Sequence, residues 1–320
     1  MKKVVVVGGG TGNFTVLSGL KHYDLDISAI VSMADDGGST GILRDDLGVL
    51  PPGDVRQCLI ALSNSSRLMR SLMSYRFENG DLGGHNFGNL LLSALEKVTG
   101  SFEKAVEEVG KILYIKGKVI PVTVHQVRLK MILEGEKILE GEKEIYLSSE
   151  IDKGYKKIYL DPDPLANPNA IAEILNADLI VLGPGGLYTS LIPNLLIDGI
   201  KEALLKSHAK KVYVVNLMNR IGQTTRYKVS NYVQEITNYL GEDCFDYILV
   251  NNQIPPEDLM EAYAKEGELV PCDLEDERII QAKLLGDLKE VAKKDLMKRS
   301  LIRHDSKKLA HELMKIVNSL

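Results

Sequence analysis

The sequence predicts an α/β fold built on a doubly wound, mostly parallel sheet. Three observations support this class. Short runs of β-branched and aliphatic residues recur without polar alternation, as in strands that are buried on both faces. Glycine-rich turns follow three of these runs directly, and stretches with helical spacing of apolar residues lie between them.

The N-terminal residues form the clearest unit. Residues 4–7 are four valines, which predict a buried strand, and residues 8–13 read Gly-Gly-Gly-Thr-Gly-Asn. A helical pattern follows over residues 14–20, and residues 27–33 predict a second strand. A strand, a glycine turn, a helix and a strand within about thirty residues form a βαβ unit. The chain therefore begins as a Rossmann-like fold.

The middle of the chain changes character twice. Residues 54–115 are predicted to be mostly helical, with a polar turn at residues 79–89 that is rich in glycine and asparagine. The hexapeptide Ile-Leu-Glu-Gly-Glu-Lys then occurs twice in tandem, at residues 132–137 and 138–143. So short a repeat predicts paired strands with Glu-Gly turns. We interpret residues 116–160 as a small β-ribbon insertion.

The α/β pattern resumes after the insertion. Strands are predicted at residues 179–182, 212–216 and 247–251, and helices at residues 169–176, 194–205 and 229–240. Residues 275–320 are predicted to form a C-terminal helical tail. Since no Pro/Ser-rich linker divides the chain, residues 1–320 are expected to form a single domain.

Composition limits the classes of function. Of 320 residues, 44% are hydrophobic and 26% are charged, which is typical of a folded protein. The formal net charge of −5 gives no basic surplus, so we expect no nucleic-acid partner. Three widely spaced cysteines predict neither disulfides nor a zinc site. No apolar run is long enough for a signal peptide core or a membrane span, and we expect a cytoplasmic protein without membrane insertion.

The glycine clusters suggest a ligand. Three of them, within residues 8–12, 37–41 and 183–186, follow predicted strands, and in a parallel sheet such loops share the edge where ligands bind. The first precedes a helix, whose amides and dipole favour a phosphate, with Thr11 and Asn13 as further donors. The alternative is that glycine merely permits a tight turn. Because Asn13 replaces the third glycine of the dinucleotide motif, and no Gly-Lys-Ser/Thr follows, NAD and ATP hydrolysis are disfavoured.

Two further motifs carry polar side chains. Asp35 and Asp36 end the second strand, where carboxylates can accept ribose hydroxyls or hold Mg²⁺ against a diphosphate. A solvated turn is the alternative. His85 opens a helix together with Asn86 and Asn89, and it is a candidate general base, phosphate donor or simple helix cap.

Taken in order, these motifs resemble the CofD/YvcK superfamily, and within it the gluconeogenesis-factor branch. The resemblance runs along nearly all of the chain. It rests on residues 8–12, 34–41, 51–56, 85–90, 183–190 and 192–196, and on Arg303-His304-Asp305 near the end.

The resemblance implies a Rossmann-like protein that binds a nucleotide-diphosphate sugar, with UDP-N-acetylglucosamine as the ligand associated with this branch. It also implies a role in cell shape and envelope growth on gluconeogenic carbon sources, without an established reaction. The sister branch transfers a phospholactyl group from a guanylylated donor to a deazaflavin alcohol and uses Mg²⁺.

Site residues follow from the same resemblance. The diphosphate would lie on the first loop, and Asp35, Asp36 and Ser39 would face the ribose or a Mg²⁺ ion. The implied nucleotide-binding residues are Gly8, Gly9, Gly10, Thr11, Gly12, Asn13, Asp35, Asp36, Ser39, Asn86, Asn89, Gly185, Tyr188, Thr189, Asn194 and Arg303. Residues 216–224 depart from the family pattern, because Ile221 and Gln223 stand in place of its proline and its acid and Arg220 adds a charge.

Three hypotheses follow. The first is a nucleotide-sugar-binding regulator with no turnover of its own. The second is a Mg²⁺-dependent transferase of phospholactyl or nucleotidyl groups. The third is an interaction scaffold for envelope-synthesis proteins that its ligand controls; a homo-oligomer is compatible with any of them.

Overall fold

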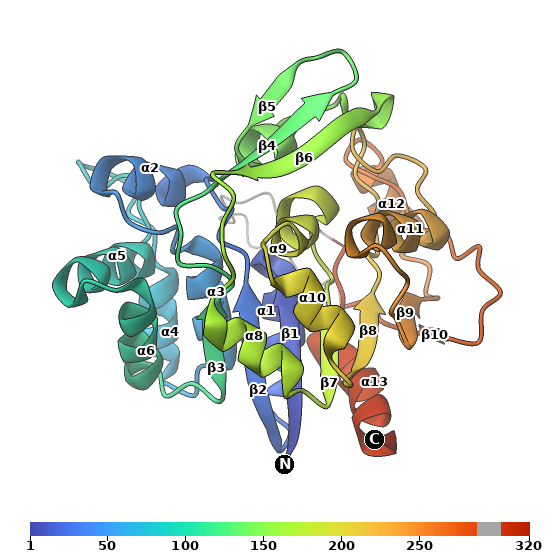
Figure 1. Ribbon diagram of the computed structural model, residues 1–320, viewed down its shortest axis with the longest axis horizontal. Coiled ribbons are helices and arrows are strands. Elements are labelled where there is room, and N and C mark those ends of the chain that lie inside the picture. The colour runs from blue at the N-terminus through green and yellow to red at the C-terminus, as the bar shows by residue number, and fades with distance from the viewer. Residues whose placement is uncertain (287–301) are drawn as a thin grey trace.

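The large sheet confirms the predicted fold class. The computed structural model describes residues 1–286 and 302–320. Seven parallel strands lie in the order β10-β9-β8-β7-β1-β2-β3 (Figure 1). The strands are β1 (Lys2–Gly8), β2 (Leu25–Val31), β3 (Lys118–Pro121), β7 (Leu179–Leu182), β8 (Lys210–Val214), β9 (Tyr247–Asn251) and β10 (Ile279–Ala282).

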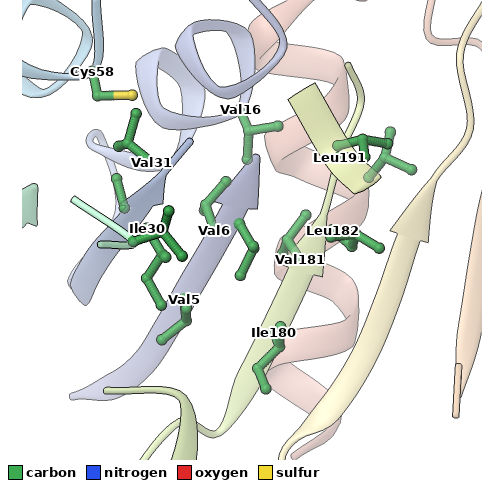
Figure 2. Close-up of a cluster of buried hydrophobic side chains, with 14 of the residues drawn as sticks. Val5, Val6, Val16, Ile30, Val31, Cys58, Ile180, Val181, Leu182 and Leu191 are labelled. Carbon is green, nitrogen blue, oxygen red and sulfur yellow. The ribbon is translucent and has the colours of Figure 1, made fainter. Parts of the chain in front are cut away.

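Helices cover both faces of this sheet, because its central strands are apolar throughout. Val4 to Val7 of β1 are buried, as are all four residues of β7. Helices α1 (Gly10–Leu20) and α13 (Ser306–Ser319) pack together on one face, and α8 (Pro168–Leu175) and α10 (Ile200–Lys206) cover the other. Figure 2 shows Val6 and Val181 of the adjacent central strands beneath Val16 of α1.

The predicted helical segment consists of four helices. They are α3 (Gly53–Leu62), α4 (Arg67–Ser74), α5 (Phe87–Thr99) and α6 (Phe102–Ile112). A further helix, α2 (Gly38–Leu47), forms where the sequence indicated only a glycine turn. The left-handed glycine Gly48 ends α2, with φ of 62°.

The second half follows the predicted order with one correction. The single helix expected at residues 194–205 is wrong: η2 (Leu187–Leu191) and α9 (Ile192–Leu195) come first, and α10 begins only at Ile200. Gly199 adopts φ of 94° between α9 and α10, which no continuous α-helix allows. Helix α11 (Val229–Leu240) lies where expected, and α12 (Glu257–Tyr263) was not foreseen.

The small sheet is more than a ribbon and begins later than predicted. Strand β3, at residues 118–121, pairs with β2 in the large sheet, so it does not belong to an insertion that starts at residue 116. The small antiparallel sheet contains β4 (Arg128–Leu133), β5 (Ile138–Glu140) and β6 (Tyr155–Asp161). The first copy of the repeat forms the β4–β5 turn, whereas the second leads into α7 (Glu142–Leu147), followed by η1 (Ile151–Lys153).

The C-terminal segment is not helical throughout. Strand β10 lies within the predicted helical tail and pairs in parallel with β9 at the edge of the large sheet. Helix α13 then packs closely on α1, where a Cβ at Gly19 would lie 2.0 Å from the Ser306 carbonyl oxygen. Among the described helices, none is long and apolar enough to cross a membrane.

Candidate functional site

The strand order reverses direction between β1 and β7, and parallel sheets bind ligands at the carboxyl ends of the strands at such a point. The loops that follow β1 and β7 at this edge are here called the crevice. The loops that leave these strands touch each other: a Cβ on Gly12 would lie 1.7 Å from the Pro184 carbonyl oxygen, so only glycine fits. The fully buried Asn194 ties the two loops together. Its amide donates to Ser190 O at 2.7 Å and to Gly8 O at 3.4 Å. The structure therefore brings Gly8, Gly12 and Asn194 together at this edge of the sheet.

Asn216, which the sequence analysis left out, fixes the loop after β7. It follows β8, and its side chain accepts from Gly185 N at 3.1 Å and donates to Gly185 O at 2.9 Å. Asn13, by contrast, is fully buried beside Gly8 and the Cys58 thiol. The structure therefore places Asn13 beneath the first loop.

The N-terminus of α1 faces a carboxylate of the protein itself. The Gly10 N–H donates to Asp54, the second residue of α3. A Cβ on Gly9 would lie 2.4 Å from the same carboxylate, so Gly9 permits this close approach. An incoming phosphate would therefore meet the Asp54 carboxyl, whose raised pKa favours its protonated form at neutral pH, next to the amides of the first loop.

Asp35 and Asp54 form the centre of a half-buried acidic cluster. Burial, reinforced by the charge of Asp35, raises the pKa of Asp54 to about 8. Burial also raises the pKa of Asp35, although hydrogen bonds from the Gly37 N–H and the Thr40 hydroxyl oppose this shift. The close packing requires Gly53, because a Cβ there would lie 2.1 Å from the Asp35 carboxylate.

Glu142 of α7 joins the cluster from the small sheet, and nothing in the sequence pattern pointed to it. Burial is the main cause that raises the pKa of Glu142 to about 9, followed by the charges of Asp35 and Asp54. The Thr189 hydroxyl donates to Glu142. Thr189 therefore connects the loop after β7 to the acidic cluster.

Asp36 points to a different partner from Asp35. Its carboxylate accepts a hydrogen bond from Lys143 N at 2.7 Å, and a Cβ on Gly141 would lie 1.9 Å from it. The sequence paired Asp35 with Asp36 as joint metal ligands. In the structure Asp54 is the carboxylate that approaches Asp35 over the first loop, while Asp36 holds α7 in place.

Ser39, Asn86 and Asn89 do come together. The Asn86 N–H donates to the Ser39 hydroxyl at 3.2 Å, and the Asn89 amide lies 3.4 Å from the Thr40 hydroxyl. Asn89 also accepts from Arg56 Nε at 2.8 Å. The side chain of Asn86 caps α5, accepting from Asn89 N at 3.2 Å, while His85 Nδ1 lies 3.4 Å from the Ser39 hydroxyl. These contacts fix the wall of the crevice beside Asp35.

Tyr188 lines a cavity that is separate from the crevice. A cavity of about 570 Å³ lies between the small sheet and α11. Tyr188 donates to or accepts from the Tyr227 hydroxyl at 3.0 Å, and its ring meets the Tyr155 ring edge-on at 5.4 Å between centroids. Glu235 and Asp152 supply carboxylates to the same cavity. Helix η2 thus carries Thr189 toward the acidic cluster and Tyr188 into the cavity.

Arg220 and Gln223 of the 216–224 segment contact α7, the helix that connects two strands of the small sheet. Gln223 donates to Ile145 O and Tyr146 O at 2.9 and 2.8 Å. The guanidinium of Arg220 lies 3.6 Å from the centre of the Tyr146 ring. Both contacts hold α7, and with it Glu142, over the crevice.

Arg303 lies beside the end of β8. Its carbonyl oxygen accepts from Gly286 N at 2.9 Å, and the adjacent His304 bonds to the backbone of Val215. This brings residues 302–305 to the same sheet edge as the crevice, and the role of the Arg303 side chain in binding stays a prediction.

The donor set suits a cation that a ligand helps to hold. Over residues 1–286 and 302–320, no three His, Cys, Asp or Glu side chains are arranged to bind a metal by themselves. Asp35 and Asp54 nevertheless supply oxygen ligands, which Mg²⁺ prefers and commonly combines with phosphate oxygens. Burial is the main cause of the raised pKa values of both carboxyls, and a bound cation would lower them again.

Comparisons with known proteins agree with this architecture. A family model described as 2-phospho-L-lactate transferase CofD matches residues 4–295. A Thermotoga maritima protein is 45% identical over 320 residues, covering 98% of this chain and 99% of its own length. A Bacillus subtilis protein named gluconeogenesis factor is 40% identical over 98% of both chains. A crystal structure of a UPF0052 family member from Bacillus halodurans superimposes with a TM-score of 0.87 at 38% identity, covering 98% of this chain and 100% of its own. The chain therefore belongs to the CofD family.

Proposed function

We propose that the chain binds a nucleotide-diphosphate sugar of the UDP-N-acetylglucosamine type and acts as a regulator without turnover of its own. The observation that carries this proposal is the crevice at the strand-order reversal, where the Gly12 loop and the Pro184 loop meet at the N-terminus of α1. Loops that lack side-chain bulk at such a point favour close approach of a diphosphate to their backbone N–H groups.

The acidic cluster limits how the diphosphate binds. A diphosphate at the Gly10 amide would lie next to the Asp54 carboxyl, and a cation held between them would favour the ionised form of that carboxyl. Asp35 and Asp54 would hold Mg²⁺, which supplies positive charge to the diphosphate oxygens when bound. The chain's own residues position this pair through Gly37, Thr40 and Arg56.

The cavity of about 570 Å³ lined by Tyr155, Tyr188 and Tyr227, here called the tyrosine cavity, would accept the far end of the ligand. Tyr188 directly precedes Thr189 in the chain, so a ligand that lies on the loop after β7 can extend into the cavity that Tyr188 lines. Aromatic rings and the carboxylates of Asp152 and Glu235 provide the stacking surfaces and hydrogen-bond acceptors that a sugar or a base uses.

Calorimetry tests this proposal directly. We expect UDP-N-acetylglucosamine to bind more tightly than GDP or NAD, and Mg²⁺ to increase its affinity. Asp35→Asn should abolish the Mg²⁺ effect, whereas Asp81→Asn, an exposed acid in the 79–84 loop, should leave it unchanged. Absence of UDP-sugar binding below millimolar concentration would refute the proposal.

The regulatory role is proposed from the relatives that are named gluconeogenesis factors. We infer a link between carbon supply and envelope growth through contacts with envelope-synthesis proteins. Purification of the tagged chain from cells, with and without added UDP-sugar, should recover such proteins in ligand-dependent amounts. Recovery that ignores the ligand would favour a constitutive scaffold instead.

A transferase is the second candidate, and the half-buried acids favour it. Glu142 and Asp54 have raised pKa values and face the crevice, as a general acid or base would. Incubation with nucleotide-activated donors and Mg²⁺ should then yield product that Glu142→Gln loses. No product from any donor that binds would leave the regulator as the function.

A further inference from the structure

A second cavity lies at the opposite end of α1 from the glycine loop. It has a volume of about 310 Å³ and lies between α1, α3 and α4. Its polar lining comes from Ser18, Lys21, Arg67, Arg70, Ser71 and Ser74. Phe14 and Ile60 supply an apolar wall. Because α1 spans about 15 Å, the Lys21 end is well separated from the Gly10 amide.

All the charged side chains that line this cavity are positive. Three cationic side chains line it, and no carboxylate in residues 1–286 and 302–320 forms an ion pair with Lys21, Arg67 or Arg70. Backbone oxygens hold two of them: Lys21 Nζ donates to Ser63 O at 3.0 Å, and Arg70 Nη1 donates to Ser65 O. The positive charges of Lys21 and Arg70 are therefore held near each other, and no carboxylate of the described residues forms an ion pair with either.

This arrangement has a measurable electrostatic signature. Burial, together with the neighbouring charge of Arg70, lowers the pKa of Lys21 below its ordinary value. An anion between the two side chains would reverse the repulsive part of that shift. The chain as a whole carries a net charge of −5, so this positive cluster is a local feature.

We propose that this cavity is a second, anion-binding site that takes the phosphate group of a small organic phosphate monoester. Guanidinium groups of Arg67 and Arg70 match phosphate oxygens as planar donors, and Lys21 adds a point charge. The serine hydroxyls donate to the remaining oxygens. The Phe14 and Ile60 side chains contact the organic part, which distinguishes an ester from inorganic phosphate.

The site goes beyond the proposed nucleotide-sugar function, because it shares no lining residue with the crevice between β1 and β7. Its cavity is also separate from the tyrosine cavity beside α11. Binding at one site can therefore be removed without removing the other.

The test is calorimetry of the full chain with phenyl phosphate, with inorganic phosphate and phenol as comparison probes. Phenyl phosphate should bind more tightly than either comparison probe, since both the charge and the ring find partners. Arg67→Gln and Lys21→Gln should each weaken this binding about tenfold or more, as loss of a charge-assisted contact does. The exposed Arg67 forms no hydrogen bond or ion pair through its side chain within the described residues, so Arg67→Gln should fold normally.

The matched control is Lys104→Gln, which removes one exposed positive charge from α6, outside the cavity. It should change phenyl phosphate affinity less than twofold. UDP-sugar binding should survive Arg67→Gln, so failure of this site and failure of the nucleotide site remain distinguishable. The proposal is overturned by absence of saturable binding up to about 10 mM, by equal effects of Arg67→Gln and Lys104→Gln, or by unchanged affinity in both cavity variants.

Discussion

Single residues decide how closely the two central loops approach. Gly12 and the Pro184 carbonyl are in contact, and only the absence of a side chain at position 12 makes this contact feasible. The sequence identified the glycine cluster but not which glycine is indispensable, because that depends on a loop from residues far along the chain.

Gly12→Ala should therefore destabilise the protein. A Cβ placed 1.7 Å from a backbone oxygen must displace one of the two loops. We expect the free energy of unfolding in urea to fall by about 2–3 kcal/mol. Gly135→Ala is the matched control, since a Cβ there would meet nothing within 4 Å, and its effect should stay within about 0.5 kcal/mol. Equal effects of the two substitutions would show that the loops do not touch.

The dependence on contacts between distant parts of the chain also explains which site residues could not be predicted from the sequence. Asp35 and Ser39 could be placed at the sheet edge because they follow a recognisable strand, β2. Asp54 and Glu142 lie on helices that reach the crevice from the helical segment and the small sheet, so only the tertiary fold reveals them. Asp36 shows the converse, since its neighbour in sequence faces the cluster while its own carboxylate binds Lys143 N.

Asp54 should make stability depend on pH. Its pKa is about 8 in the folded protein and about 4 in the unfolded chain. Between these values the folded state retains a proton that the unfolded state has lost, so stability falls as pH rises from about 4 to 8. The contribution between pH 5 and pH 8 is about 3 kcal/mol.

Urea unfolding of Asp54→Asn at both pH values measures this contribution. The variant should show a pH dependence that is flatter by about that amount, whereas Asp81→Asn should follow the unmodified protein. A slope that Asp54→Asn leaves unchanged would mean that Asp54 is ionised throughout this range.

At the scale of secondary-structure elements, the sequence predicted the strands of the large sheet better than the helices and turns between them. β7 and β9 lie at their predicted residues because buried parallel strands are continuous apolar runs. Helix α2 was missed because its first residues, Gly38 to Gly41, have poor helix propensity, and tertiary contacts outweigh that preference. The tandem repeat predicted the paired strands β4 and β5 and the turn between them, but its second copy continues from β5 into the start of α7.

The C-terminal segment depends on a half-buried histidine at the end of β8. His304 bonds to the backbone of Val215, and burial lowers its pKa to about 4. In the unfolded chain its pKa is about 6.5, so the folded state resists protonation. The stability that this neutral histidine contributes is complete above about pH 6.5 and is lost as the pH falls toward 4.

Between pH 7 and pH 5 this loss should amount to about 2 kcal/mol. Replacing His304 with glutamine removes the titrating group, so the variant should lose about that much less stability over the same interval. His311→Gln, an exposed histidine on α13, should keep the normal dependence. Matching pH profiles for the two variants would contradict a half-buried neutral His304.

At the scale of the whole molecule, the small sheet is attached over the crevice rather than appended to the fold (Figure 1). Asp36 binds Lys143 N, Gln223 binds the carbonyls of α7, and Asp152 accepts from Thr225 N at 3.2 Å. These contacts come from loops after two different strands of the large sheet. The position of Glu142 over Asp35 and Asp54 is therefore a property of the assembled molecule.

Asp36→Ala should loosen this attachment without unfolding the large sheet. Removing the carboxylate leaves Lys143 N without its acceptor and opens space beside Gly141, so α7 loses its anchor on the loop after β2. Hydrogen exchange followed by mass spectrometry should show faster exchange in residues 138–147, by about tenfold for a contact worth about 1.4 kcal/mol. Peptides from β1 and β7 should keep their protection, and Asp81→Ala should leave both regions unchanged. Faster exchange in β1 as well would mean that the small sheet and the large sheet unfold as one unit, because the crevice contacts would then stabilise the whole fold.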